Sequence, residues 1–174
     1  PENGLRAVVD VHEIAALEWG AARASAAVWR IVQGACEGDD EFRATSRMNY
    51  AGEPLSCHVM FASASPGSPV IGLRSPNGRR LARGDGVTTA VGYWGGLSCR
   101  AGLFTDHDDA FLDTAKAYFR GLVEWYDVAD IGVAGGEIFA GVTEALEEHG
   151  LEQALNPGHL TGHDEWVHTP VRPG

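Results

Sequence analysis

The stretch from Gly84 to Phe104, GDGVTTAVGYWGGLSCRAGLF, constrains the fold most, because it contains two runs typical of β-strands. These runs, 87–93 and 97–104, are rich in β-branched and aromatic residues, and the Gly95-Gly96 pair between them favours a hairpin. Beyond Asp85 the stretch contains no Asp, Glu or His. The predicted hairpin therefore carries no good ligand for a hard metal ion.

Helices are predicted on both sides of this hairpin, because apolar residues recur there every three or four positions. We expect helices at 10–36, from Asp39 or Asp40 to about 50, from a cap at Asp106 to 127, and at about 136–149. The helix capped by Asp106 should bury Phe111, Ala115, Phe119, Leu122 and Tyr126. Short apolar runs predict strands at 55–62 and 70–73.

Length, charge and cysteine content limit the classes of protein to consider. The 174 residues suffice for one domain, and the net charge of −11 argues against nucleic acid or an anionic membrane as a partner. No apolar run reaches the roughly 20 residues that a membrane-spanning helix needs. Three cysteines without zinc-type spacing favour a reducing compartment, so we expect the cytoplasm.

The C-terminal tail is the stretch densest in groups that can do chemistry. Residues 156–174, NPGHLTGHDEWVHTPVRPG, hold His159, His163, Glu165 and His168. The zinc-protease pattern HExxH is absent, and in a strand His159 and His163 would lie about 13 Å apart by rise alone. That is too far for the two to share one ion unless the strand bends.

Four arginines surround the turn Ser75-Pro76-Asn77-Gly78, namely Arg74, Arg79, Arg80 and Arg83. This is the one concentrated basic feature of an acidic chain. Two interpretations stay open: a solvated turn with intramolecular ion pairs, or recognition of a carboxylate or phosphate by the bidentate guanidinium.

Four short motifs, in their order along the chain, resemble the creatinase and aminopeptidase P family. They are the opening LRAVVDVHEIAALEWGAARASAAV, the ECGDxE-like CEGDDEF, the RRLARGDGV lead into the hairpin, and the Gly158-His159 pair. The resemblance implies an α+β pita-bread domain over 1–174, with an antiparallel curved sheet covered by long helices. It also implies that final strands and an N-terminal domain lie outside this sequence.

Family peptidases bind two metals through Asp, Asp, His, Glu and Glu. The resemblance places the first Asp at Ala90 and the second within Leu97–Arg100, where no carboxylate stands, and the His at His159. Both glutamates would lie after Gly174. Metal-free creatinase uses a loop histidine, and Leu73, Arg74 and Ser75 occupy that place here. We therefore expect neither a dinuclear metal site nor a cofactor.

Two functions remain in view. The first is metal-independent hydrolysis of an amide or C–N bond, with His159, His168 and Glu165 as catalytic residues. Substrate, a peptide or small molecule, would be bound by Arg74, His163 and Tyr93. The alternative is a non-catalytic homologue that binds a small molecule, peptide or protein. A third possibility is a structural dimer module, because five tryptophans are many for 174 residues and aromatic residues are enriched at interfaces; we expect a homodimer.

Overall fold

The computed structural model describes residues 9–160 and 168–173 and divides them into two compact units. The first unit ends at Asp106 and the second begins at His107. The first unit contains α1 (Val11–Gly34), α2 (Glu41–Ser46), β1 (Met60–Ala64), β2 (Gly86–Tyr93) and β3 (Gly96–Leu103). The second contains α3 (Asp109–Val128), α4 (Gly135–Glu147), β4 (His159–Leu160) and β5 (His168–Pro170).

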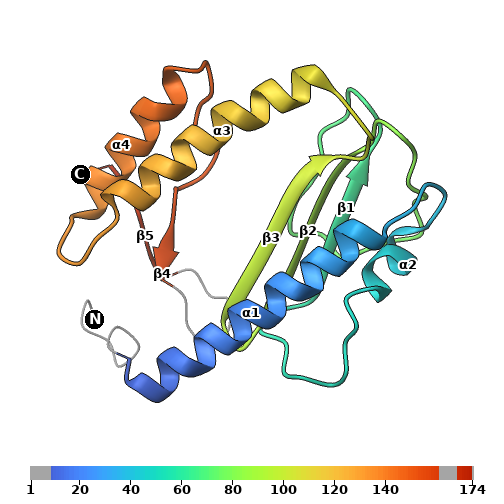
Figure 1. Ribbon diagram of the computed structural model, residues 1–174, viewed down its shortest axis with the longest axis horizontal. Helices are drawn as coiled ribbons and strands as arrows, with labels where there is room; N and C mark the ends of the chain where they lie inside the picture. Colours follow the sequence, from blue (N-terminus) through green and yellow to red (C-terminus); the bar gives the residue numbers. More distant parts are fainter. Residues whose placement is uncertain (1–8, 161–167, 174) are drawn as a thin grey trace. The chain divides into compact units, whose positions relative to one another are not determined.

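The first unit is an antiparallel sheet in the order β1-β2-β3, as Figure 1 shows. The predicted hairpin is confirmed as β2 and β3, whose register pairs Gly86 with Leu103 at the open end. Its turn consists of Trp94 and Gly95, which both have positive φ, 47° and 78°. Two positive φ values match the twist that a tight hairpin needs, so the turn lies one residue before the expected Gly95-Gly96 pair.

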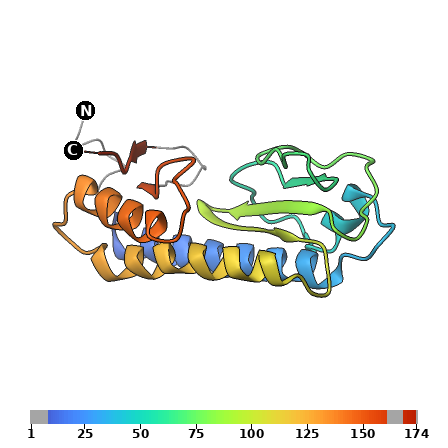
Figure 2. The ribbon, with the colours of Figure 1, turned by 90° about the horizontal axis from the view of Figure 1, so that it is seen from above.

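Helix α1 lies along one face of this sheet (Figure 2). It starts at Asp10, whose carboxylate accepts hydrogen bonds from the N–H groups of His12 and Glu13, both at 2.9 Å. Its buried residues are mostly small: Gly20, Ala24, Ala27, Val28 and Ile31. Small side chains let the helix approach the strands closely. The core forms where α1 meets Phe61, Leu81, Val91 and Tyr93.

Two strand predictions need correction. The strand expected at 55–62 runs instead from Met60 to Ala64. Before it, the Leu55–Tyr93 bridge and the bond from Ser56 N to Gly92 O join the chain to the end of β2, and the Ser56 hydroxyl accepts from Gly95 N. The strand expected at 70–73 is a loop, in which Leu73 has the left-handed φ of 62°.

The second helix is shorter than predicted. Asp40 caps it as one of the two expected candidates, accepting from Arg43 N at 2.8 Å. It ends at Ser46 rather than near Tyr50. The hydroxyls of Thr45 and Ser46 donate to backbone carbonyls of the same helix, a pattern that competes with continued helix.

In the second unit, α3 packs against α4. Gly121 makes this possible, because a Cβ there would lie 2.7 Å from Leu146 Cδ2. The cap is Asp108, which accepts from Phe111 N, and not Asp106, which pairs with Arg83 instead.

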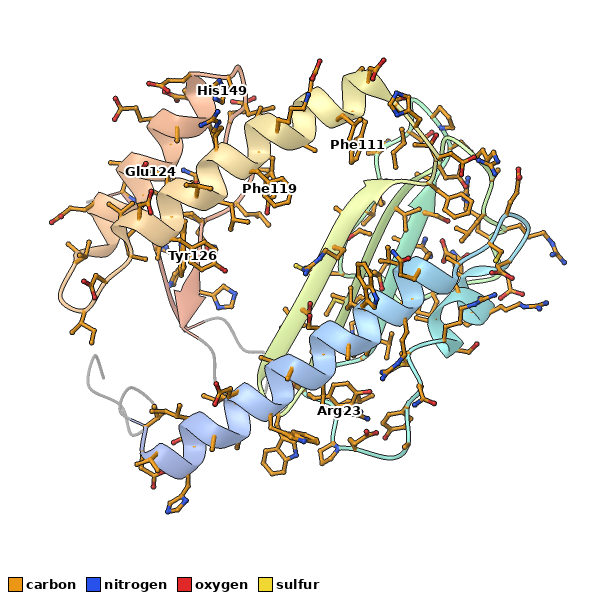
Figure 3. All side chains as sticks on the ribbon, viewed as in Figure 1. Arg23, Phe111, Phe119, Glu124, Tyr126 and His149 are labelled. Carbon is orange, nitrogen blue, oxygen red and sulfur yellow. The ribbon has the colours of Figure 1, made fainter. Side chains whose placement is uncertain are left out.

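The buried stripe predicted for α3 is wrong at two positions. Phe119 and Tyr126 are 56% and 70% exposed, and Figure 3 shows them on the side of α3 that faces away from α4. The stripe that meets α4 runs through Gly121 and Glu124 instead. Among the described residues, none of the helices combines the length and apolarity needed to cross a membrane.

Close approach of α1 to the hairpin predicts the effect of adding one methyl group. An Ala Cβ at Gly20 would lie 2.1 Å from Tyr93 O, and one at Gly96 would lie 2.0 Å from Ala21 N. We expect Gly20→Ala and Gly96→Ala each to lower the free energy of unfolding by about 2 kcal/mol or more, measured by urea denaturation. Gly72→Ala is the matched control, because no atom lies within 4 Å of its added Cβ. Equal stability of all three variants would contradict the close packing.

Candidate functional site

Ala90 lies at the centre of the hairpin, between Met60 on β1 and Cys99 on β3. Side chains alternate along a strand, and Val91 and Tyr93 belong to the core beneath α1. Ala90 therefore faces the other side of the sheet, where it is 7% exposed. Its register partner Cys99 is exposed and carries a free thiol.

Strand alternation places Thr88 and Gly92 on the same face as Ala90. At neighbouring Gly92 an added Cβ would lie 3.2 Å from Cys57 Sγ and 3.3 Å from Leu97 Cδ1. Across the part of the chain that the structure describes, three or more His, Cys, Asp or Glu side chains nowhere converge as a metal-binding group. Ala90 itself has no donor atom.

Glu41 is the polar centre of the first unit and has no exposed surface. Its carboxylate accepts from Arg74 Nη2 at 2.8 Å and Arg74 Nη1 at 3.0 Å, a bidentate pair. It also accepts from the N–H and hydroxyl of Ser63 and from Asn77 N. Burial raises the pKa of Glu41, but the hydrogen bonds from Arg74, Ser63 and Asn77 outweigh it and hold the pKa below its ordinary value.

Asp85 forms a second buried ion pair beside the first. Arg79 donates to its two oxygens at 2.6 and 2.8 Å, and Ala82 N adds a third bond at 2.8 Å. The Arg79 hydrogen bond is the main cause that lowers the pKa of Asp85. Arg83 pairs with Asp106 and Glu37. The interpretation of the basic cluster as intramolecular ion pairs is thus confirmed for Arg74, Arg79 and Arg83.

Tyr93 is buried at the end of β2, 1% exposed. Trp19 meets its ring edge-to-face with centroids 6.5 Å apart, and the Arg23 guanidinium lies 5.9 Å from the ring centroid. Burial raises the pKa of its hydroxyl, which has no hydrogen-bond partner among the described residues. The side chain thus belongs to the core on the α1 side of the sheet.

His159 is half-buried and begins β4 in the second unit. Its strand is anchored by the bond from Val171 N to Gly158 O, 2.8 Å, and by pairing with Pro170. Gly158 lies close to the indole of Trp125, because a Cβ there would be 3.3 Å from Nε1. His168 begins β5, where its backbone pairs with Leu160. His163 and Glu165 lie outside the described residues.

The predicted site residues are therefore distributed between the units: Arg74 and Tyr93 lie in the first, and His159 and His168 in the second. Sequence reasoning missed Glu41, which organises the arginine-rich turn. Its signal was present in CEGDDEF, where Glu41 follows the helix-capping Asp40, but first-turn carboxylates usually stay at the surface.

Several solved structures share this architecture. Prolidase from Pyrococcus furiosus matches with a TM-score of 0.80 and 18% identity over 96% of this chain and 52% of its own. Xaa-Pro dipeptidase from Bacillus anthracis and X-Pro aminopeptidase from Thermotoga maritima each match with a TM-score of 0.76 and 18% identity over 96% of this chain. This chain has the pita-bread fold of creatinase and aminopeptidase P.

The chain spans about half the length of the two enzymes from Bacillus anthracis and Thermotoga maritima, 50% of each. No protein-family model and no curated protein matches the sequence. The α+β architecture expected from the motifs, with an antiparallel sheet and long helices, is confirmed by these structures.

The buried Glu41 pair predicts an acid-sensitive contribution to stability. We expect Glu41→Gln to lower the free energy of unfolding at pH 7 by about 2 kcal/mol, because Arg74 loses a bidentate partner but stays partly solvated. A lowered folded-state pKa stabilises the fold above the unfolded pKa of about 4.3, and this stability is lost as pH falls below it. Urea unfolding between pH 7 and 3 should therefore show a shallower loss in Glu41→Gln than in wild type.

Asp113→Asn is the matched control for this experiment. Its carboxylate also pairs with a cation, Lys116, but both side chains are about three-quarters exposed. We expect a change below about 0.5 kcal/mol. If Glu41→Gln behaved like this surface variant, Glu41 would not hold the first unit together.

Proposed function

We propose that this chain is a hydrolase-like protein that cleaves an amide or C–N bond of a peptide or small molecule without a dinuclear metal centre. His159 acts as the general acid and base in this proposal. The fold shared with prolidase and Xaa-Pro dipeptidase supports the reaction class. The residues of the hairpin are the reason for proposing a reaction without two metal ions.

One observation carries the metal-free form of the proposal: the register pair of Ala90 and Cys99. Two hard divalent cations held close together need several anionic oxygen ligands. Alanine supplies no ligand, and a thiol is a soft donor suited to other metals. The residues on this face of the hairpin do not fit a dinuclear centre, so the proposed hydrolysis does not use one.

Roles follow for the predicted site residues. Imidazole is the side chain whose protonation changes nearest neutral pH, which suits His159 to proton transfer. His168 and Glu165 would orient it, and His163 would contact the substrate. Arg74 would hold an anionic substrate group through the N–H groups that Glu41 leaves unused. Tyr93 would act indirectly, because it is buried and only fixes the end of β2.

A second candidate function is binding without catalysis. The register pair of Ala90 and Cys99 favours it, because a hairpin without a carboxylate at these positions lacks the ligands of a catalytic dinuclear centre. In this form the fold serves to bind a small molecule, peptide or protein. The two candidates differ in whether His159 turns the ligand over.

The wider setting is also a proposal. Three cysteines without zinc-type spacing support a cytoplasmic location, and the net charge of −11 argues against nucleic-acid and anionic-membrane partners. A homodimer is supported by exposed Trp19 and Trp94, 44% and 41% exposed, since aromatic residues are enriched in interfaces.

Hydrolysis in the presence of a chelator tests the proposal. Xaa-Pro dipeptides, longer Xaa-Pro peptides and creatine are assayed with wild type, His159→Ala and the control His149→Ala, whose histidine is exposed at the end of α4. We expect turnover that survives the chelator, falls at least about 100-fold in His159→Ala and is unchanged in His149→Ala.

Two results would decide against this mechanism. Turnover that disappears with chelator and returns with added Mn²⁺ would contradict the metal-free reaction. Binding of these compounds by calorimetry without turnover, equal in wild type and His159→Ala, would replace catalysis by the binding function.

A further inference from the structure

Two adjoining hollows lie on the α1 side of the hairpin, within the first unit. The smaller has a volume of about 110 Å³ and is walled by buried Ile31, Phe61 and Leu81 together with Phe104. The larger, about 550 Å³, is an open groove beside Trp29 on α1. Both include Val32, Arg100 and Ala101 in their walls, so they adjoin, and the two together are called the depression below.

The walls are mostly apolar, with one cation and two hydroxyl side chains, Thr89 in the smaller hollow and Ser25 in the larger. Thr89 contributes a hydroxyl to the smaller hollow, but that hydroxyl donates to Met60 O at 3.0 Å. Arg100 is the single charged residue in the walls of both hollows. A depression with apolar walls and one fixed charge is the usual form of a site for an amphipathic ligand.

Arg100 differs from most arginines of the first unit in lacking a carboxylate partner. Its Nη1 donates to Cys99 O, and among the described residues it forms no ion pair. Six other arginines of the same unit are each paired with Asp or Glu: Arg23, Arg43, Arg47, Arg74, Arg79 and Arg83. In a chain of net charge −11, an unpaired guanidinium at the rim of an apolar hollow leaves room for an external anion.

We propose that this depression binds an amphipathic carboxylate, with the carboxylate on Arg100 and the hydrocarbon tail in the smaller hollow. Guanidinium binds carboxylate through two parallel hydrogen bonds. An apolar cavity of about 150 Å³ accepts a benzene molecule. The smaller hollow, about 110 Å³, is therefore large enough for a short alkyl chain but not for several side chains of a protein partner. The wider groove beside Trp29 accommodates the remaining carbons.

The residues that line the two hollows include none of those assigned to the proposed reaction. Arg100 pairs with Thr89 in the β2–β3 register, and Thr89 lines the hollow on the α1 side. Ala90, the next residue, faces the opposite side of the sheet. Ligand binding here therefore stands whether or not His159 is catalytic.

Titration with sodium octanoate tests the proposal, with 1-octanol as the uncharged probe of equal chain length. The indole N–H signal of Trp29 in two-dimensional NMR, assigned with Trp29→Phe, reports on the groove. We expect octanoate to shift this signal and to bind about tenfold more tightly than octanol, because only octanoate engages Arg100.

Three variants make the experiment specific. Arg100→Gln should abolish the tenfold preference, Arg100→Lys should keep part of it, and Arg120→Gln on α3 should leave it unchanged. Equal binding of octanoate and octanol by wild type would overturn the proposal, as would an unchanged preference in Arg100→Gln. A Trp29 signal that octanoate does not shift would overturn it as well. The same holds if a second copy of the chain covers Trp29 and so keeps the ligand out.

Discussion

The buried carboxylate of Glu41 is the interaction on which the arrangement of the first unit depends. It joins α2, β1 and the loop before the hairpin, because its hydrogen-bond donors come from Ser63, Arg74 and Asn77. A carboxylate without exposed surface is costly unless charge and hydrogen bonds compensate it, and here both do. The Arg79–Asp85 pair continues the same network to the start of β2.

This network separates structural charge from candidate chemistry. The ion pairs gather at Ser63, which pairs with Val87, while Ala90 points to the other face of the sheet. The arginine cluster therefore holds the loop at one end of the sheet. The face that carries Ala90 and Cys99 is left with small and sulfur-bearing side chains, which is why the proposed reaction relies on imidazole rather than on a metal.

Local patterns predicted the long elements well. The hairpin, α1, α4 and the Asp40 cap follow from β-branched runs, helical periodicity and short polar side chains, all of which act within a few residues. Short strands were less predictable. Residues 70–73 look like a strand by composition, but the left-handed φ of Leu73 and tertiary contacts make them a loop.

Long-range pairing lay outside the reach of sequence reasoning. Asp106 pairs with Arg83, and Asp108 rather than Asp106 caps α3. The sequence of residues 106–109, DHDD, does not by itself indicate which aspartate takes which role. Glu41 and Arg74 are 33 residues apart and meet only in the folded chain. His159 was identified by residue type and by the family resemblance. Its pairing with β5 could not be predicted, because no sequence pattern near His159 indicates which strand it pairs with.

Calorimetric titration of the chelator-treated, dialysed protein with Mn²⁺ tests the central claim, that the pair of Ala90 and Cys99 replaces a dinuclear centre. We expect no Mn²⁺ binding with a dissociation constant below about 0.1 mM, the range of weak oxygen-ligand sites. Two tightly bound ions per chain would contradict it.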